Sequence, residues 1–163
     1  MSQAVFEREP APRRLTLSRT YRNLLVLGLT GPAAGGKSFL LGIFRELGAA
    51  AIEADAVYRD LVLPGAPLLS RIDEAFPGVV TADGLDREEL STRVFGNPND
   101  LLRLNAVVHP PLGDAVAQAA GEAAASGNRR VVIAAAVLFE NGAAGLCDEI
   151  WFADCPPEER IRR

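Results

Sequence analysis

A continuous apolar run that ends in a glycine-rich turn constrains the fold of this chain more than any other feature. Leu24 to Thr30 has the length and composition of a buried parallel strand. The turn carries the pattern Gly31-x-x-x-x-Gly36-Lys37-Ser38, and an amphipathic segment begins directly after it. This order of strand, turn and helix is the context that a phosphate-binding loop requires. The sequence therefore predicts an α/β domain that binds a nucleoside triphosphate.

The residue types in the turn suit that task. Glycines allow successive backbone N–H groups to form a concave nest for anionic oxygens, and the following helix adds its free N–H groups and the positive end of its dipole. We expect Lys37, the only lysine in the chain, to reach the β- and γ-phosphates, and the Ser38 hydroxyl to bind Mg²⁺. The residues expected to contact ATP are Gly31, Ala34, Gly35, Gly36, Lys37, Ser38 and Phe39. An ordinary glycine turn into a helix is the alternative.

Composition bounds the remaining possibilities. With 163 residues, 48% of them hydrophobic, the chain has the size of one globular domain. The net charge of −4 and a pI near 5.1 argue against nucleic acid or an anionic membrane as the main partner. No apolar segment is long enough to span a membrane, and residues 1–22 lack the apolar core of a secretory signal. We interpret these residues as a flexible leader and expect a cytoplasmic protein.

The rest of the chain alternates between strand-like and helix-like segments, which predicts a parallel sheet flanked by helices. Further strands are expected at residues 49–52, 131–139 and 149–153. Residues 66–126 are almost entirely helical in pattern and should form a helical subdomain within a kinase domain at 23–163. Within it, one helix is expected to end at Val108 and another to begin at Pro110.

Read together, these segments resemble the dephospho-CoA kinase family, from about Leu24 to Arg163. Beyond the phosphate loop, the motifs that carry the resemblance are Ala54-Asp55 with Arg59-Asp60-Leu61, Asp83-Gly84-Leu85-Asp86-Arg87, Arg93-Val94-Phe95, His109-Pro110, Leu138-Phe139-Glu140-Asn141-Gly142 and Pro157-Glu158-Glu159-Arg160. The resemblance implies transfer of the ATP γ-phosphoryl group to the ribose 3′-hydroxyl of dephospho-CoA, the last step of coenzyme A synthesis. It implies a nucleotide-kinase-like fold, a helical subdomain on the coenzyme A side, and ATP and Mg²⁺ as cofactors.

The resemblance also implies roles for single residues. Asp55 matches the family's aspartate after the second strand and is expected to act as the base, with Lys37 as the other catalytic residue. Asp55 is also a candidate ligand of Mg²⁺ beside Ser38. The alternative is that Asp55 caps a helix starting at Ala56. Glu53 stands where the family usually has aspartate, and its longer side chain is compatible with an outer-shell role at the metal.

Arginine and histidine residues are candidates for the acceptor site. Arg59 lies one helical turn beyond Asp55 and is expected to bind a substrate phosphate, the alternative being a solvated helix arginine. His109, the only histidine, is expected either to contact the substrate or to be a hydrogen-bonded structural residue. Arg87 and Arg93 are interpreted as packing or surface charges, with substrate contact as the alternative.

Three departures from the family pattern bear on activity. Pro32 removes one N–H from the loop, and Ala34 stands where glycine would be free to take positive φ, for which Gly35 is expected to compensate in part. Residues 131–136 carry no acidic side chain for a metal. The chain ends at Arg163, whereas relatives continue into a lid with phosphate-clamping arginines and a final edge strand. The only candidates for such arginines are Arg160, Arg162 and Arg163, at the position where the lid of the relatives begins. Without the final edge strand, the sheet should also keep an unpaired edge.

These departures leave alternatives to an active dephospho-CoA kinase. One is a catalytically impaired remnant that lacks the lid but binds nucleotide or coenzyme A. Another is a phosphate-loop kinase that acts on a different nucleoside-like acceptor.

Overall fold

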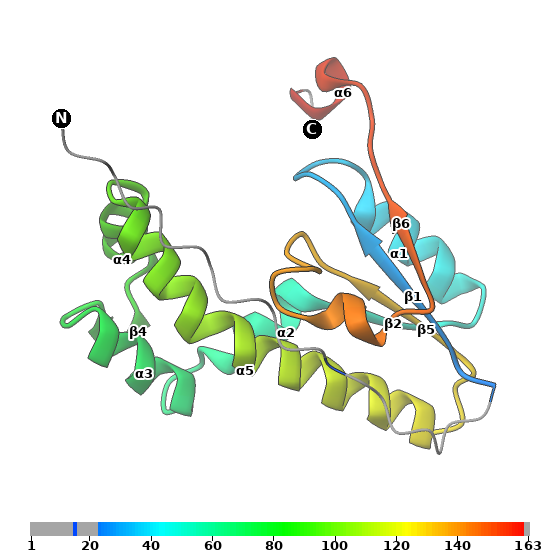
Figure 1. Ribbon diagram of the computed structural model, residues 1–163, viewed down its shortest axis with the longest axis horizontal. Coiled ribbons are helices and arrows are strands. Elements are labelled where there is room, and N and C mark those ends of the chain that lie inside the picture. Colours follow the sequence, from blue (N-terminus) through cyan, green and yellow to red (C-terminus); the bar gives the residue numbers. More distant parts are fainter. Residues whose placement is uncertain (1–14, 16–22, 162–163) are drawn as a thin grey trace, which may run out of the picture.

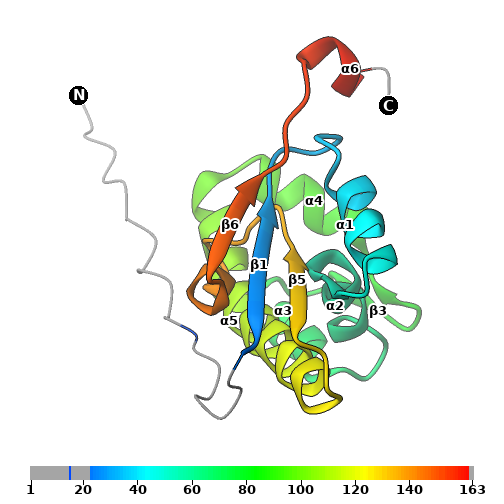
Figure 2. The same ribbon diagram turned by 90° about the vertical axis from the view of Figure 1, so that its right-hand side faces the viewer.

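The computed structural model describes Leu15 and residues 23–161, and its centre is a four-stranded parallel sheet. The strands are β1 (Leu25–Thr30), β2 (Ala50–Glu53), β5 (Arg130–Ala134) and β6 (Glu149–Phe152). Their order is β2-β5-β1-β6, and Figure 2 shows β6, β1 and β5 side by side. The parallel α/β architecture expected from the alternating segments is confirmed. As expected, β6 pairs on one side only within the described residues.

Alternating side chains divide the sheet into two packed faces. Leu27 and Leu29 of β1 join a core with Leu41 of α1 (Lys37–Glu46). Val26, on the opposite face of the same strand, joins a core with Val116 of α5 (Pro98–Ala125). Because β1 is covered on both faces, its sequence is apolar throughout rather than alternating.

A second group of helices lies beside the sheet and has its own core (Figure 1). It contains α3 (Pro67–Ala75), α4 (Arg87–Phe95), the amino-terminal half of α5, and a small hairpin of β3 (Val80–Thr81) and β4 (Gly84–Leu85) that the sequence analysis missed. Ile72 and Val79 are fully buried there. Helix α2 (Ala54–Leu61) connects the two regions, since its Tyr58 packs against both cores.

Helix α5 continues through Pro110 and Pro111, so the expected break before Pro110 is wrong. Each proline in a helix interior costs about 3 kcal/mol. Against that cost, α5 buries Val108, Leu112 and Val116, which contribute about 1.5–3 kcal/mol each, together with further small residues. Packing along the whole length of α5 therefore outweighs the local preference for a break.

Strand β5 ends at Ala134, earlier than the expected strand at 131–139, at the level where its partner β2 also ends. Ala134 pairs with Glu53 on one side and with Leu29 on the other. Beyond Ala134 the chain turns, with Asn141 N–H donating to the Val137 carbonyl at 3.1 Å, and it continues into the short 3₁₀ helix η1 (Ala143–Leu146). The last element is helix α6 (Pro157–Ile161), which lies beyond the end of β6 in Figure 1.

One residue of the proposed leader falls within the described part of the chain. Leu15 is buried in the same core as Leu112 and Val116, and a Cβ at Gly113 would lie 3.0 Å from Leu15 Cδ1. The other residues of 1–22 lie outside the described residues, so their interpretation as a flexible leader stays a prediction.

Candidate active site

The phosphate loop joins β1 to α1 in the conformation that anion binding requires. Gly36 occupies the position before α1 with φ 99°, and no side chain caps the helix there. The first N–H groups of α1 are therefore available to an anion, at the positive end of the helix dipole. Leu40 N–H, one turn along, already donates to the Gly36 carbonyl at 3.0 Å.

Lys37 is folded over the loop rather than extended into solvent. Its Nζ donates to the carbonyl oxygens of Gly31 and Pro32, both at 2.8 Å. The Pro32 carbonyl also accepts from Gly35 N–H at 3.1 Å. An ammonium group has three N–H donors, so one remains for a phosphate oxygen while two hold the loop.

In the phosphate loop, the positive φ is found at Ala34 and not at Gly35. Ala34 itself takes the left-handed conformation, with φ 57°, and Gly35 is not among the residues with positive φ. Gly35 is required for space instead, because a Cβ there would lie 2.7 Å from the Ala153 carbonyl oxygen and 3.0 Å from that of Pro32. The expected compensation by Gly35 is therefore wrong, and the strain stays on Ala34.

A second polar segment reaches the loop from the end of β2. Ser38 Oγ lies 3.4 Å from Glu53 Oε1, which places the start of α1 beside the carboxyl end of this strand. Asp55 follows two residues later, exposed, within the first turn of α2. Glu53, not Asp55, occupies the position before α2, and no side-chain hydrogen bond caps the helix. The alternative role of Asp55 as a helix cap is therefore wrong.

The remaining predicted residues lie on three helices. Arg59 is exposed in the last turn of α2, and its guanidinium has no hydrogen bond or ion pair within the part of the chain that the structure describes. Phe39 lies in the first turn of α1 with 72% of its surface exposed. His109 is half-buried in the middle of α5, in helical rather than extended backbone.

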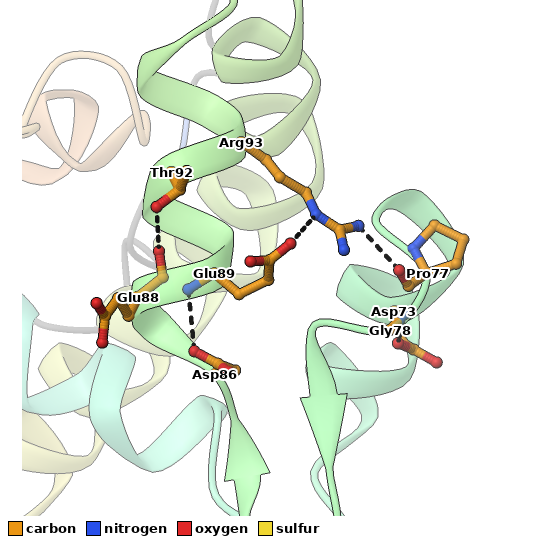
Figure 3. A network of polar contacts seen from close by, with 8 residues as sticks. All are labelled: Asp73, Pro77, Gly78, Asp86, Glu88, Glu89, Thr92 and Arg93. Atoms are coloured by element: carbon orange, nitrogen blue, oxygen red, sulfur yellow. Dashed lines mark hydrogen bonds and ion pairs between the residues drawn. The ribbon is translucent and has the colours of Figure 1, made fainter.

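Arg93 has a structural role (Figure 3). Its Nε is 2.7 Å from Glu89 Oε1, and its Nη1 donates to the Pro77 carbonyl at 2.9 Å. The packing interpretation of this arginine therefore agrees with the structure. Near the end of the chain, Arg160 Nε is 4.0 Å from Asp154 Oδ1, while Arg162 and Arg163 lie outside the described residues.

Candidate metal ligands are few and are all oxygens. The described residues contain no group of three or more His, Cys, Asp or Glu side chains placed to hold a metal ion. The 3.4 Å separation of Ser38 Oγ and Glu53 Oε1 is nevertheless close to the ~2.9 Å between adjacent oxygens on octahedral Mg²⁺. These two oxygens fit a Mg²⁺ ion that would complete its shell with water and phosphate oxygens.

Comparison with known proteins decides the family to which this site belongs. The family model described as dephospho-CoA kinase matches residues 25–163. This chain belongs to the dephospho-CoA kinase family. Named dephospho-CoA kinases include that of Carboxydothermus hydrogenoformans, 39% identical over 142 residues, an alignment that covers 86% of this chain and 69% of the relative. That of Deinococcus radiodurans is 38% identical over 156 residues, covering 96% of this chain and 72% of the relative.

Solved structures support the observed fold. TT1252 from Thermus thermophilus superposes with a TM-score of 0.71 at 28% identity, covering 86% of this chain and 71% of that one. Dephospho-CoA kinase from Campylobacter jejuni superposes with a TM-score of 0.57 at 15% identity, covering 86% and 96%, and supports the fold. Among the described residues, no helix has the length and apolar character needed to cross a membrane.

The sequence did not indicate that the segment after β6 packs against the phosphate loop. A side chain at Gly31 or Gly35 would collide with the carbonyl of Ala153, which follows β6 more than a hundred residues later. Ala153 N–H donates to the Thr30 carbonyl at 2.7 Å, and Cys155 Sγ lies 3.6 Å from the Ala34 carbonyl. Apart from the Cys155 thiol, the contacting atoms after β6 are backbone atoms, so nothing in the local sequence indicates this support.

Proposed function

We propose that this member of the dephospho-CoA kinase family transfers the γ-phosphoryl group of ATP to the ribose 3′-hydroxyl of dephospho-CoA. The observation that carries the proposal is the contact between Ser38 and Glu53 at 3.4 Å. It places a phosphate loop beside the strand end that leads to Asp55. Phosphoryl transfer needs this juxtaposition of a phosphate-binding group with a carboxylate that positions the attacking hydroxyl.

Binding of the ATP phosphates is assigned to the loop and to the first turn of α1. The uncapped N–H groups after Gly36 face the anion, and the third donor of Lys37 is directed to the β- or γ-phosphate. Because Lys37 keeps its two bonds to the loop, it serves as a rigid charge rather than a flexible one. That arrangement favours electrostatic stabilisation without reorganisation during the reaction.

We assign Mg²⁺ to Ser38 and Glu53, with Asp55 as a further candidate ligand. When bound, the ion would neutralise charge on the β- and γ-phosphate oxygens. No carboxylate is available on β5, whose last residue is Ala134 and which continues as Ala135-Ala136. The carboxylate oxygens at the end of β2 are therefore proposed to bind the metal ion instead of a carboxylate on β5.

Asp55 is proposed as the base that accepts the proton of the 3′-hydroxyl or orients it for attack. It is exposed, and it lies in the first turn of α2, directly after the end of β2. Arg59, one turn further along α2, is proposed to bind the acceptor, and His109 on α5 is proposed as a second acceptor contact.

A coupled assay of ADP release by the 163-residue chain tests the function, with Mg-ATP in the presence and absence of dephospho-CoA. The proposal expects release that depends on dephospho-CoA, with transfer to the 3′-oxygen verified by mass spectrometry. A panel of other nucleosides provides the comparison. Preference for another acceptor would refute the assigned substrate. A thermal shift with ATP but no turnover with any acceptor would refute the activity and indicate a binding remnant.

A further inference from the structure

A second arginine, Arg87, reaches from the helical subdomain to the helix that carries the candidate base. The guanidinium carbon of Arg87, the first residue of α4, lies 6.0 Å from the centroid of the Tyr58 ring on α2. Like that of Arg59, this guanidinium has no hydrogen bond or ion pair within the described residues. Two guanidinium groups without an ion-pair partner among the described residues are therefore associated with one short helix that also carries Asp55.

None of the neighbouring carboxylates forms an ion pair with Arg87 among the described residues. The Glu89 carboxylate is held by Arg93 at 2.7 Å, and Asp86 Oδ1 accepts from the Glu89 N–H at 2.9 Å (Figure 3). The Glu88 carboxylate has no hydrogen bond or ion pair in the described part of the chain, and Glu88 is exposed to solvent. A cation at the first position of a helix also faces the positive end of the dipole, which is unfavourable without an anion.

The uncharged Tyr58 ring contacts the Arg87 guanidinium. Burial raises the pKa of the Tyr58 phenol, and the nearby charge of Arg87 lowers that pKa by less. The phenol is therefore uncharged at neutral pH and does not act as a counter-ion. Tyr58 is also packed against both cores, so its ring is fixed relative to the sheet and to the helical subdomain. The ring holds the guanidinium in place without using its N–H donors.

The spacing on α2 relates Arg59, and the Tyr58 ring that Arg87 contacts, to the base. Tyr58 and Arg59 are three and four residues after Asp55, which places all three on neighbouring positions of one helix face. In dephospho-CoA, the 5′-diphosphate is separated from the reacting 3′-hydroxyl by the ribose ring alone. A cation one helical turn from the base is thus at the right separation for the diphosphate when the 3′-hydroxyl is at Asp55.

We propose that Arg87, held on the Tyr58 ring, binds the diphosphate of the acceptor together with Arg59. This inference rests on the proposed function and assigns a residue that selects the acceptor. The phosphates of ATP are bound by the loop and Lys37, so these cations serve the other substrate. The planar guanidinium can bind two phosphate oxygens at once, which an acceptor without a diphosphate does not offer.

The test compares Arg87→Gln with Arg103→Gln in the full chain. Arg103 is a matched control, because its guanidinium lies 5.5 Å from the Phe76 ring in the same helical subdomain. Loss of a charge-assisted phosphate contact should raise the KM for dephospho-CoA about 10- to 100-fold. The kcat and the KM for ATP should stay within about 2-fold, and Arg87→Lys should recover part of the loss. Arg103→Gln should leave all three parameters unchanged.

Calorimetric titration gives a readout that does not require turnover. Dephospho-CoA should bind Arg87→Gln about 10- to 100-fold more weakly than the unmodified chain, while adenosine, which lacks the diphosphate, should bind both equally. Equal losses for the two ligands, or equal effects of Arg87→Gln and Arg103→Gln, would overturn the inference and leave Arg87 a packing residue. If the chain binds dephospho-CoA in this way but shows no turnover, the proposed activity fails while the diphosphate site stands. Absence of dephospho-CoA binding would overturn both.

Discussion

Replacement of Gly35 by alanine tests whether the phosphate loop is shaped by the chain beneath it. The backbone of Gly35 has no positive φ, so alanine is conformationally acceptable there. Its Cβ would lie 2.7 Å from the Ala153 carbonyl oxygen, about 0.7 Å closer than the 3.4 Å at which ordinary contacts begin. The neighbour is backbone on an ordered strand end and has no rotamer by which to move away. The loop itself must therefore shift.

The expected cost follows from that shift. Overpacking of this kind costs about 1–3 kcal/mol. For a chain of this size, each kcal/mol lowers Tm by about 2–4 °C, so Gly35→Ala should lower Tm by about 2–12 °C. Displacement of the N–H groups that face the phosphates should also weaken ATP binding by about 10- to 100-fold.

Thermal denaturation with and without Mg-ATP measures both effects, and titration calorimetry gives the Kd. Gly42→Ala is the control, since a Cβ at Gly42, in the middle of α1, would meet nothing within 4 Å. Its helix propensity should stabilise the chain by up to about 1 kcal/mol without affecting ATP. If Gly35→Ala has the Tm and the Kd of the unmodified chain, the loop does not rest on Ala153 and the argument fails.

Further predictions concern single groups. Lys37→Ala should abolish turnover and weaken ATP binding in calorimetry, since it removes the phosphate donor and two 2.8 Å bonds within the loop; retained turnover would remove Lys37 from the mechanism. Asp55→Asn should lower kcat by about 10²–10⁴ in the coupled assay while the Kd for ATP stays the same, and an unchanged kcat would contradict its role as base. Glu53→Gln should raise the Mg²⁺ concentration needed for half-maximal rate, and an unaltered Mg²⁺ dependence would exclude it as a ligand. Burial, with a smaller contribution from Asp148, raises the pKa of the Cys147 thiol from 9.0 to about 11. The folded chain therefore keeps this proton where the unfolded chain has lost it, so stability should fall as the pH rises from 9 to 11. Urea titrations should show a weaker fall for Cys147→Ala than for Cys155→Ala, and equal slopes would contradict the assignment.

The parts of the site that the sequence predicted depend on local chemistry. The span from β1 through the loop to α1 is encoded by contiguous residues, since the apolar run, the glycines and the amphipathic segment each favour one conformation. Glu53 and Asp55 could be placed because the carboxyl ends of parallel strands meet at one edge. Both inferences needed only short-range patterns and a general rule of sheet topology.

The parts that could not be predicted depend on contacts between distant residues. Nothing near Ala153 indicates that its carbonyl supports Gly31 and Gly35, because any residue has a carbonyl. The continuity of α5 through Pro110 depends on what each half of that helix buries, which the local proline signal opposes. Periodicity likewise gives no information on where β5 loses its partner strands.

The proposed ATP site and the proposed acceptor site are attached to different parts of the fold. The loop is held by β1, by α1 and by the chain after β6, all attached to the sheet. Of the proposed acceptor cations, Arg59 belongs to α2, and Arg87 of α4 contacts Tyr58 of α2, which packs against both the sheet core and the helical core. Any change in the packing of the helical subdomain therefore moves Arg87 relative to Asp55 while the loop stays fixed. Substitutions in the helical core should accordingly change the KM for the acceptor before they change the KM for ATP.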